Sequence, residues 1–530
     1  MEYSVINKPV IAVIRHGKQE EVSLRELIAG AHELEDMGGS AIESYAQLRF
    51  ATAFVMDMLE MTTSRDRRRA FEAGRFDEQV FDRYVEACRA EGSVFDLFDG
   101  ERPFMQSAFT EERRQKTEKP ASIMDLTVPS GNDATFLGEG GGVLGYSVSE
   151  KYEMTIPKAF RVMLARQCFS GYSLEGPWAI NRMPYYLYPK GSNLFETILL
   201  NTLSEEEALP LEYGRGRVPW RNGRAVIGEK GKTETDVTFL EALTWQPRKI
   251  QMLPSEDGMI RRVCLTRGLD FAGEYVDPYV IRIRNVRTDT VMLLKPDVQR
   301  AGWLIIANVV ADTEETSIVR PDFLHSFMNV YSDRPKNVTL NIIGVDRDPK
   351  LSKFYGWVRD EMIIPESLLE NNEQAETLLL DLRFMANCER NIALMVRGCV
   401  DDPKAFENHQ KKGKWAFDRR KKPIVSDEVT AYFTKQCEGI VEDLCMSDML
   451  GGMSWEEHTE RVCEAVKDVV KSTMTYMYGM LGSSEKEMEK GRRAEQEIWH
   501  RCGYQIKERK GEITNGDETG KVEPEESDNE

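Results

Sequence analysis

The segment SLLENNEQAETLLLDLRFMANCERNIALMV, residues 367–396, decides the fold class that we expect for this chain. Its apolar residues recur every three to four positions, the spacing that places them on one face of an α-helix. Two further segments, residues 424–449 and 455–500, repeat this spacing and contain few prolines. Three to five long helices joined by short or polar loops indicate a helical bundle of the four-helix type.

The chain before this segment contains both strand and helix patterns. Residues 9–14, PVIAVI, are typical of a short strand, and Ser23 with Glu26 has the capping-box spacing that starts a helix. From residue 44 to 91 the apolar residues again recur at helical spacing, which predicts two or three helices. Runs such as YVIRIRNV and NVTLNIIGV within residues 260–345 are rich in β-branched residues and predict strands.

The predicted fold class is therefore α+β. A large mixed α/β body spans residues 1–365, and an all-α helical bundle spans residues 366–508. The remaining residues, 509–530, are expected to be a disordered tail. The stretch GEITNGDETGKVEPEESDNE is acidic and contains almost no large apolar side chain that could join a core.

The composition is that of a folded protein. The chain has 530 residues, of which 41% are hydrophobic and 30% are charged, a balance that supports packed cores. It contains no run of about 18 apolar residues, so no membrane span is expected. The first residues, MEYSVINKPVIAVIRHGK, lack the regions of a secretion signal, so we expect a cytoplasmic location.

The charge distribution is uneven. The formal net charge of -19 argues against a uniform nucleic-acid-binding surface, because phosphate repels an acidic protein. Basic residues nevertheless gather in four clumps, at 65–69, 215–224, 261–267 and 411–422. A local patch of this kind can bind phosphate, and solvated surface charge is the alternative interpretation of each.

Sequence signatures of catalysis and metal binding are absent. The nine cysteines include no C-x-x-C pair and the six histidines include no H-E-x-x-H motif. Neither a disulfide framework nor a zinc site is therefore indicated. No G-x-S-x-G motif and no P-loop occurs, and no carboxylate pair is distinguished by its context. We predict no catalytic residue, no metal and no cofactor.

One glycine-rich stretch supports an alternative. Residues 130–145, SGNDATFLGEGGGVLG, contain Gly140, Gly142 and Gly145 in the G-x-G-x-x-G pattern of dinucleotide-binding loops. That pattern requires a preceding strand and a following helix whose N-terminus faces the pyrophosphate. The residues that follow, YSVSEKYEMTIP, do not read as an amphipathic helix. A nucleotide- or dinucleotide-dependent enzyme that uses the loop at 138–145 stays open as an alternative function.

Aromatic residues on long loops are a further signal. Their rings can stack on bases or wedge between base steps, and packing in the core is the alternative. These residues are Phe104, Phe136, Phe169, Tyr172, Trp178, Trp220 and Trp245.

Four phrases together resemble a known family. They are VFDLFDGERPFMQ (94–106), SGNDATFL (130–137), LFETILLNTL (194–203) and LTWQPRKIQML (243–253). In order and spacing they resemble the CasA family, the large subunits of the type I-E CRISPR surveillance complex Cascade. The resemblance covers most of residues 94–360, whereas the helical region agrees in length and character only.

The resemblance implies a non-catalytic function. Such a subunit recognises the short motif (PAM) that flanks a target in double-stranded DNA, promotes duplex opening and R-loop formation, and recruits a helicase–nuclease. Base pairing with the guide RNA reads the rest of the target. The implied partners are the 5′ end of the guide CRISPR RNA, the target duplex, the helicase–nuclease, and the backbone, capping and small subunits of Cascade. A helical scaffold that binds only protein is a further alternative.

The resemblance also implies a loop that docks the subunit onto the guide RNA. Its residues in this chain are Phe136, Leu137, Gly138, Gly140, Gly141 and Gly142. Glycines would give this loop conformational freedom before docking.

Two other implied elements contact the flanking-motif duplex. A loop with less glycine than the family pattern corresponds to Phe169, Gly171 and Tyr172. A basic finger that enters the minor groove corresponds to Arg267, because a narrow minor groove concentrates the negative potential that attracts arginine. Its expected phosphate-contacting neighbours are Arg261 and Arg262.

The last implied element is a wedge loop, which in the family usually carries a glutamine that splits the first base pair. The matching region, GVDRDPKLSKFYGW at 344–357, contains no glutamine. Its expected motif-reading residues are Arg347, Asp348, Pro349 and Lys350. Pro349 or Lys350 stands where the glutamine is expected, and proline can wedge between base steps. We therefore expect a motif preference that differs from that of better-known relatives.

Overall fold

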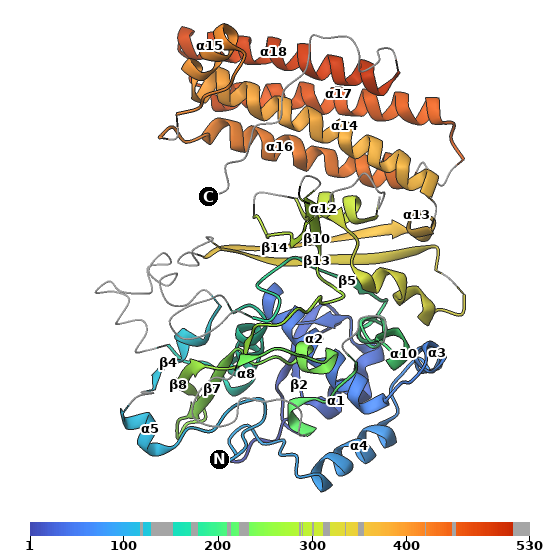
Figure 1. The fold of residues 1–530 in the computed structure, drawn as a ribbon, viewed down its shortest axis with the longest axis vertical. Helices are drawn as coiled ribbons and strands as arrows, with labels where there is room; N and C mark the ends of the chain where they lie inside the picture. Colours follow the sequence, from blue (N-terminus) through green and yellow to red (C-terminus); the bar gives the residue numbers. More distant parts are fainter. Residues whose placement is uncertain are drawn as a thin grey trace. The chain divides into compact units, whose positions relative to one another are not determined.

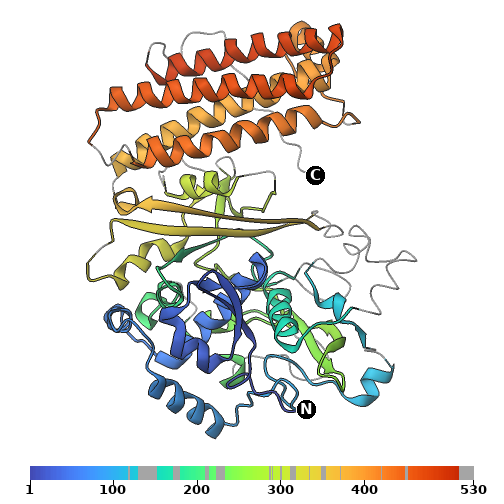
Figure 2. The same cartoon turned by 180° about the vertical axis from the view of Figure 1, so that it is seen from behind.

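The computed structural model contains two compact units. The first comprises Met1–Val298 and Ser317–Met362, and the second comprises Gln299–Thr316 and Ile363–Glu530. Figures 1 and 2 show their elements from two opposite sides. The residues that the structure describes are 1–116, 120–128, 152–170, 179–208, 214–221, 233–285, 288, 290–298, 301–310, 318–333, 335–347, 354–370, 372–418, 420–447 and 452–511.

The helix α2 (Ala41–Leu59) forms the centre of the first unit (Figure 1). Every residue from Ile42 to Met58 is buried, so neighbouring elements cover this helix on all sides. Aromatic rings fill the space around it, and Phe50 lies 5.8 Å from Phe160 and 5.6 Å from Trp220 between ring centroids. Edge-to-face contacts of this kind add to the stabilisation that apolar burial provides.

The other helices of the first unit are short. Ser23 caps the first of them through a capping box with Glu26, as the sequence predicts. The expected helices within residues 44–91 are also confirmed, as α2, α3 and α4. The described helices besides α2 are α1 (Leu24–Gly30), α3 (Ser64–Glu72), α4 (Glu78–Ala90), α5 (Glu111–Lys116), α8 (Ile156–Cys168), α9 (Leu194–Leu200), α10 (Glu205–Ala208) and α11 (Phe239–Leu243).

The strands form several small sheets rather than one large sheet. Their orders are β2-β1-β3, β14-β13-β5, β4-β8-β7, β11-β10-β12 and β6-β9. The strands are β1 (Ile11–Arg15), β2 (Lys18–Val22), β3 (Asp36–Met37), β4 (Ala121–Ser122), β5 (Tyr186–Lys190), β6 (Thr233–Glu234), β7 (Arg248–Pro254), β8 (Ile260–Arg267), β9 (Asp270–Phe271), β10 (Arg282–Asn285), β11 (Thr290–Leu293), β12 (Ile318–Val319), β13 (Asn337–Arg347) and β14 (Phe354–Pro365). The long strands β13 and β14 cross the unit side by side (Figures 1 and 2).

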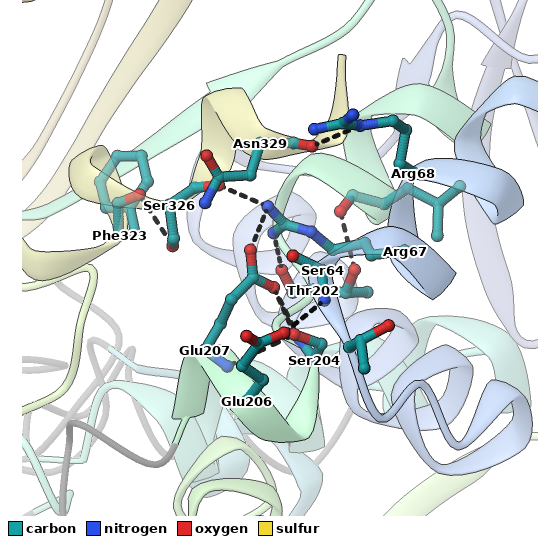
Figure 3. A network of polar contacts seen from close by, with 12 residues as sticks. Ser64, Arg67, Arg68, Thr202, Ser204, Glu206, Glu207, Phe323, Ser326 and Asn329 are labelled. Atoms are coloured by element: carbon teal, nitrogen blue, oxygen red, sulfur yellow. Dashed lines mark hydrogen bonds and ion pairs between the residues drawn. The ribbon is translucent and has the colours of Figure 1, made fainter. Parts of the chain in front are cut away.

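Two arginines of the basic clump at 65–69 form contacts within the protein. Figure 3 shows the Arg67 guanidinium between two other segments of the chain, which carry Thr202 and Glu207 in one case and Ser326 in the other. It forms a 2.9 Å ion pair with Glu207 and donates hydrogen bonds of 2.5 Å to the carbonyls of Thr202 and Ser326. The neighbouring Arg68 donates to the carbonyl of Asn329 at 3.1 Å. Because Arg67 is fully buried, it joins α3 to distant segments and is not available to bind phosphate.

The second unit is helical. Its long helices are α14 (Asn372–Val396), α16 (Ile424–Ile440), α17 (Trp455–Met480) and α18 (Glu485–Arg509), and its shorter ones are α12 (Gly302–Val310), α13 (Glu366–Glu370) and α15 (Pro403–Lys412). The long helices run alongside one another, with α14 against α16 and α18, and α17 against α16 and α18 (Figure 2). The segment that predicts the bundle, residues 367–396, supplies α14 and most of α13.

One buried carboxylate connects three helices of the bundle. Asp381 on α14 accepts hydrogen bonds of 3.0 and 2.6 Å from Arg509 on α18. Its other oxygen lies 2.8 Å from Nε2 of His458 on α17. All three side chains are at least nine-tenths buried. A carboxylate that is shared in this way keeps the three helices in a single register.

The predicted fold class, α+β with a C-terminal helical bundle, is confirmed. The predicted domain boundary at residue 365 stays a prediction, and residues 299–316, which include α12, group with the helical unit. Residues 512–530, which make up nearly all of the predicted tail, lie outside the described residues. Among the described helices, none is long and apolar enough to cross a bilayer.

Candidate nucleic-acid interface

The sheet β4-β8-β7 carries the expected basic finger. Strands β7 and β8 pair antiparallel with Arg248 opposite Arg267 and Ile250 opposite Leu265. This register places Arg267 at the last position of β8, next to the first residue of β7. The short strand β4 lies along the other edge of β8, with Ser122 opposite Arg262.

Helix α8 is fixed to the same end of this sheet. The side chain of Gln167 donates to the carbonyl of Arg248 at 2.9 Å and accepts from the Arg248 amide at 3.1 Å. A paired amide of this kind continues the ladder of β7 and satisfies two buried backbone groups. The end of α8 therefore lies beside the strand ends that carry Arg248 and Arg267.

A second arginine brings another segment to this place. Arg166 of α8 is buried and donates to the carbonyls of Thr127 and Val128, at 3.2 and 3.4 Å. Val128 is the last described residue before the glycine-rich stretch. The segment before the expected docking loop and the segment before the expected loop at Phe169 thus meet beside the end of β8. That strand end bears Arg267. The chain order alone does not predict this meeting.

Arg267 is exposed and has no intramolecular partner that the structure describes. Neither a hydrogen bond nor an ion pair joins its guanidinium to another described residue, and the same is true of Arg262. Both cations are therefore available for an external phosphate or base edge as far as the described residues show. The expected roles of these two residues stay predictions.

Arg261 differs from its two neighbours. It forms ion pairs of 2.5 Å with Glu153 and 2.6 Å with Asp257. The hydrogen bonds from Arg261 lower the pKa of the Asp257 carboxyl to about 2. To contact a phosphate, as the resemblance implies, Arg261 would first have to leave these two carboxylates.

Phe169, one of the expected DNA-contacting residues, is fully buried. Its ring centroid lies 6.2 Å from that of Tyr45 and 6.0 Å from that of Tyr186. The expectation of a direct contact with DNA does not fit this burial, because no face of the ring is accessible. Phe169 instead anchors the end of α8 at the start of the second expected loop.

Other aromatic residues from the loops are also in the core. The side chains of Phe104, Trp220 and Trp245 are buried, so packing, the alternative interpretation, holds for them. The remaining aromatic residues of that set, Phe136, Tyr172 and Trp178, lie outside the described residues. Phe104 and Trp220 pack against Phe50 of α2, whereas Trp245 packs against Phe271.

A buried ion pair supports the segment that follows the second expected loop. Arg49 of α2 lies 2.8 Å from Asp277, and Asn181 donates to the same carboxylate oxygen at 2.8 Å. Asn181 also contacts the hydroxyl of Tyr186 at 3.1 Å. An adjacent cavity of about 30 Å³, lined among others by Arg49 and Trp245, has room for water but not for a nucleotide.

Most of the remaining expected site residues lie outside the described residues. This applies to Phe136, Leu137, Gly138, Gly140, Gly141 and Gly142 of the expected docking loop, to Gly171 and Tyr172, and to Asp348, Pro349 and Lys350 of the expected wedge. Arg347 is the last residue of β13, which places the expected wedge between the ends of β13 and β14.

Strand β14, which follows the expected wedge in the chain, exposes two large aromatic side chains. Tyr355 is 54% exposed and Trp357 is 43% exposed, both on β14. Sequence reasoning missed them, although both stand in the phrase GVDRDPKLSKFYGW. The signal that could have found them is the alternation along the strand, because Phe354 and Val358 are buried on either side of the pair.

The architecture does not support the dinucleotide-binding alternative. A Rossmann unit requires a parallel sheet with crossover helices. Of the strand pairings that the structure describes, only the two-residue pair β6–β9 is parallel. The described residues also contain no group of three or more His, Cys, Asp or Glu side chains that could hold a metal ion.

An α+β body with a helical bundle is the fold of a class of CRISPR-associated proteins. The crystal structure of Cse1 from Acidimicrobium ferrooxidans superimposes with a TM-score of 0.73 at 17% identity, over 96% of this chain and 99% of that one. A chain from a structure described as a CRISPR RNA-guided surveillance complex superimposes with a TM-score of 0.69 at 14% identity, over 94% and 99% of the two chains.

The family is shown by sequence. The model of the CRISPR-associated protein Cse1 family matches residues 5–476, so this chain belongs to the Cse1 family. A curated relative, the CRISPR-associated protein CasA/Cse1 of Thermus thermophilus, is 24% identical over 326 residues. That match spans 57% of this chain and 59% of the relative, which is less than two-thirds of the relative's length. The predicted resemblance to the CasA family is therefore confirmed.

Proposed function

We propose that this chain is the large, non-catalytic subunit of a type I-E RNA-guided surveillance complex. It recognises the motif that flanks a target in double-stranded DNA, promotes opening of the duplex and recruits a helicase–nuclease. Its partners are the 5′ end of the guide RNA, the target DNA and the other subunits of the complex. Membership of the Cse1 family carries this proposal, because one chain of similar fold comes from an RNA-guided surveillance complex.

The arrangement around β8 is compatible with motif recognition. Arg267 is an exposed cation at a strand end, supported by a buried framework that includes Arg248 and Gln167. A rigid support holds an arginine in place, so little conformational entropy is lost when the side chain enters a groove. The net charge of -19 disfavours contacts between DNA phosphates and the rest of the protein surface. DNA is therefore restricted to local basic surfaces.

In this proposal, the contribution of the chain to duplex opening is positional. Phosphate contacts hold the duplex, and arginine in the minor groove reads the motif. The segment between β13 and β14 separates the first base pair, at a cost of about a few kcal/mol for unstacking one step. Pairing between the guide RNA and the target strand then offsets this cost.

Replacement of Arg267 by alanine tests the reading role. In the assembled complex, Arg267→Ala should weaken binding to motif-bearing duplex by about tenfold or more and leave binding to random duplex nearly unchanged. Equilibrium binding to the two duplexes at one fixed salt concentration measures this difference. Arg262→Ala is the matched control, because it removes an exposed cation from the same strand. A phosphate contact at Arg262 would weaken both duplexes equally, whereas equal losses for Arg267→Ala would contradict its reading role.

A further inference from the structure

The exposed aromatic pair on β14 has no role in the function proposed above. Tyr355 and Trp357 are separated by one residue, so their side chains project from the same face of the strand. Large apolar side chains are costly to expose in such proximity, and exposed aromatic groups commonly mark binding surfaces. The chain keeps both rings accessible even though Phe354 beside them is buried.

The spacing of the rings suits an unstacked nucleic-acid strand. Residues two apart on a strand lie roughly 6.5 to 7 Å apart along its axis, from a rise of about 3.3 Å per residue. A planar base can stack on each ring at such a spacing only if the two bases are no longer stacked on each other. Single-strand binding proteins use aromatic platforms of this kind, because every base has a π-face.

The local sequence has the pattern of a known base-stacking strand. RNA-recognition strands follow K/R-G-F/Y-G/A-F-V, and their aromatic residues stack on bases. Residues 353–358 read KFYGWV and match at the basic, tyrosine, glycine and valine positions; Phe354 replaces the first glycine of the pattern and Trp357 replaces its phenylalanine. The surrounding sheet, β14-β13-β5, has a different topology, so the similarity concerns the strand surface alone.

Gly356 separates the two aromatic residues along the strand and packs closely against Val298. A Cβ added at this residue would lie 3.1 Å from Cγ1 of Val298, which is tighter than an ordinary contact. The close packing of Val298 against the glycine supports the strand from one side. Arg359, two residues beyond Trp357, is exposed and forms a 3.4 Å surface ion pair with Asp36. Surface pairs of this kind are weak, so the arginine can exchange its carboxylate for a phosphate.

We propose that Tyr355 and Trp357 form a stacking platform for unpaired bases of nucleic acid. β14 begins where the segment carrying the expected wedge ends, so a base released at that segment would be close to the platform. Stacking would hold the released base apart from its partner strand. Tyr355 and Trp357 would therefore stabilise the opened state in a chain that lacks the usual wedge glutamine. This role at the wedge rests on the function proposed above, whereas the stacking surface itself does not.

Binding of short single strands by the full chain alone tests the platform. The probes are an oligothymidylate and an abasic oligomer of equal length, which have the same phosphates and differ in their bases. The wild-type chain should bind oligothymidylate more tightly. Tyr355→Leu with Trp357→Leu should reduce that affinity by about tenfold or more and leave binding of the abasic oligomer unchanged.

Two control variants distinguish a loss of base stacking from a nonspecific effect of the substitutions on the folded chain. Tyr355→Phe with Trp357→Phe keeps both rings and should bind like the wild type. Trp455→Leu removes a similarly exposed tryptophan, at 46%, from the helical unit and should have no effect on binding of oligothymidylate. Equal affinity of the wild-type chain for both oligomers, or unchanged affinity of the double leucine variant for oligothymidylate, would overturn the proposal. A partner protein that covers the two rings would give that negative result.

The test is independent of motif recognition. It uses isolated strands without a flanking motif and without guide RNA, so a failure of the motif-reading role would leave it unaffected. In the assembled complex, a fluorescent base analogue at the first opened pair provides a second measurement. Its signal on opening should fall in the double leucine variant, and no change there would contradict a role at the wedge.

Discussion

At the scale of single residues, the arginines of this chain lie in two distinct environments. Arg67 is fully buried and forms internal contacts, whereas Arg267 is exposed and has no partner among the described residues. Both belong to basic clumps that look equivalent in the sequence. The difference depends on neighbours that are far away along the chain, such as Glu207 and Ser326 for Arg67. A clump of basic residues alone therefore does not identify a phosphate-binding surface.

Loss of Arg67 should destabilise the first unit strongly. Arg67→Ala leaves the buried Glu207 carboxylate without its cation and the carbonyls of Thr202 and Ser326 without a donor, which we expect to cost about 3–5 kcal/mol. Thermal unfolding measures the effect as a lower midpoint. Arg69→Ala is the matched control, because Arg69 lies on the same helix and is 63% exposed. Similar midpoints for both variants would contradict the structural role of Arg67.

At the scale of elements, the bundle is the part that the sequence predicts best. The helical spacing in residues 367–396 continues over many turns, and a long periodic signal needs no information from distant segments. The body is less predictable, because its sheets are small and their strands pair across large sequence separations. Strand β13, for instance, pairs with β5, in which Tyr186 lies opposite Ile343.

The candidate site is predictable only in part for the same reason. The resemblance to a family indicates Arg267, but its exposure depends on the register between β7 and β8. The burial of Phe169 depends on Tyr45 and Tyr186, which lie far from it in the sequence. The pairing of Arg261 with Glu153 depends on a bridge between Met154 and Ile260. None of these neighbours can be inferred from local spacing.

The carboxylate that connects the bundle helices should be essential to the bundle. Asp381→Ala leaves the Arg509 guanidinium buried without its carboxylate, and we expect a destabilisation of about 3–5 kcal/mol. Hydrogen exchange of α14, α17 and α18 is the suitable measurement, because it reports on the helices of the bundle separately from the first unit. The adjacent Leu380→Ala, at a side chain that is 43% exposed, should leave exchange nearly unchanged. Equal exchange in the two variants would contradict the role of Asp381.

At the scale of the whole molecule, the chain combines an acidic net charge with a few local surfaces suited to nucleic acid. The two surfaces in the first unit differ in chemistry. The end of β8 offers cations for phosphate and groove contacts, and β14 offers rings for base stacking. In the proposed function the end of β8 holds the duplex, and in the further inference the rings on β14 hold a base after the duplex opens. The expectation that the motif preference differs from that of better-known relatives rests on the absence of glutamine between β13 and β14 and stays a prediction.

The central claim is that this chain makes target binding by an RNA-guided complex depend on a flanking motif. The direct measurement adds the purified chain to the remaining subunits loaded with guide RNA, and follows binding to a matched target with and without the motif. We predict that the complex binds the motif-bearing duplex far more tightly once the chain is present, and that the target lacking the motif gains little. Equal binding of both targets in the presence of the chain would contradict the account, and so would motif-dependent binding without it.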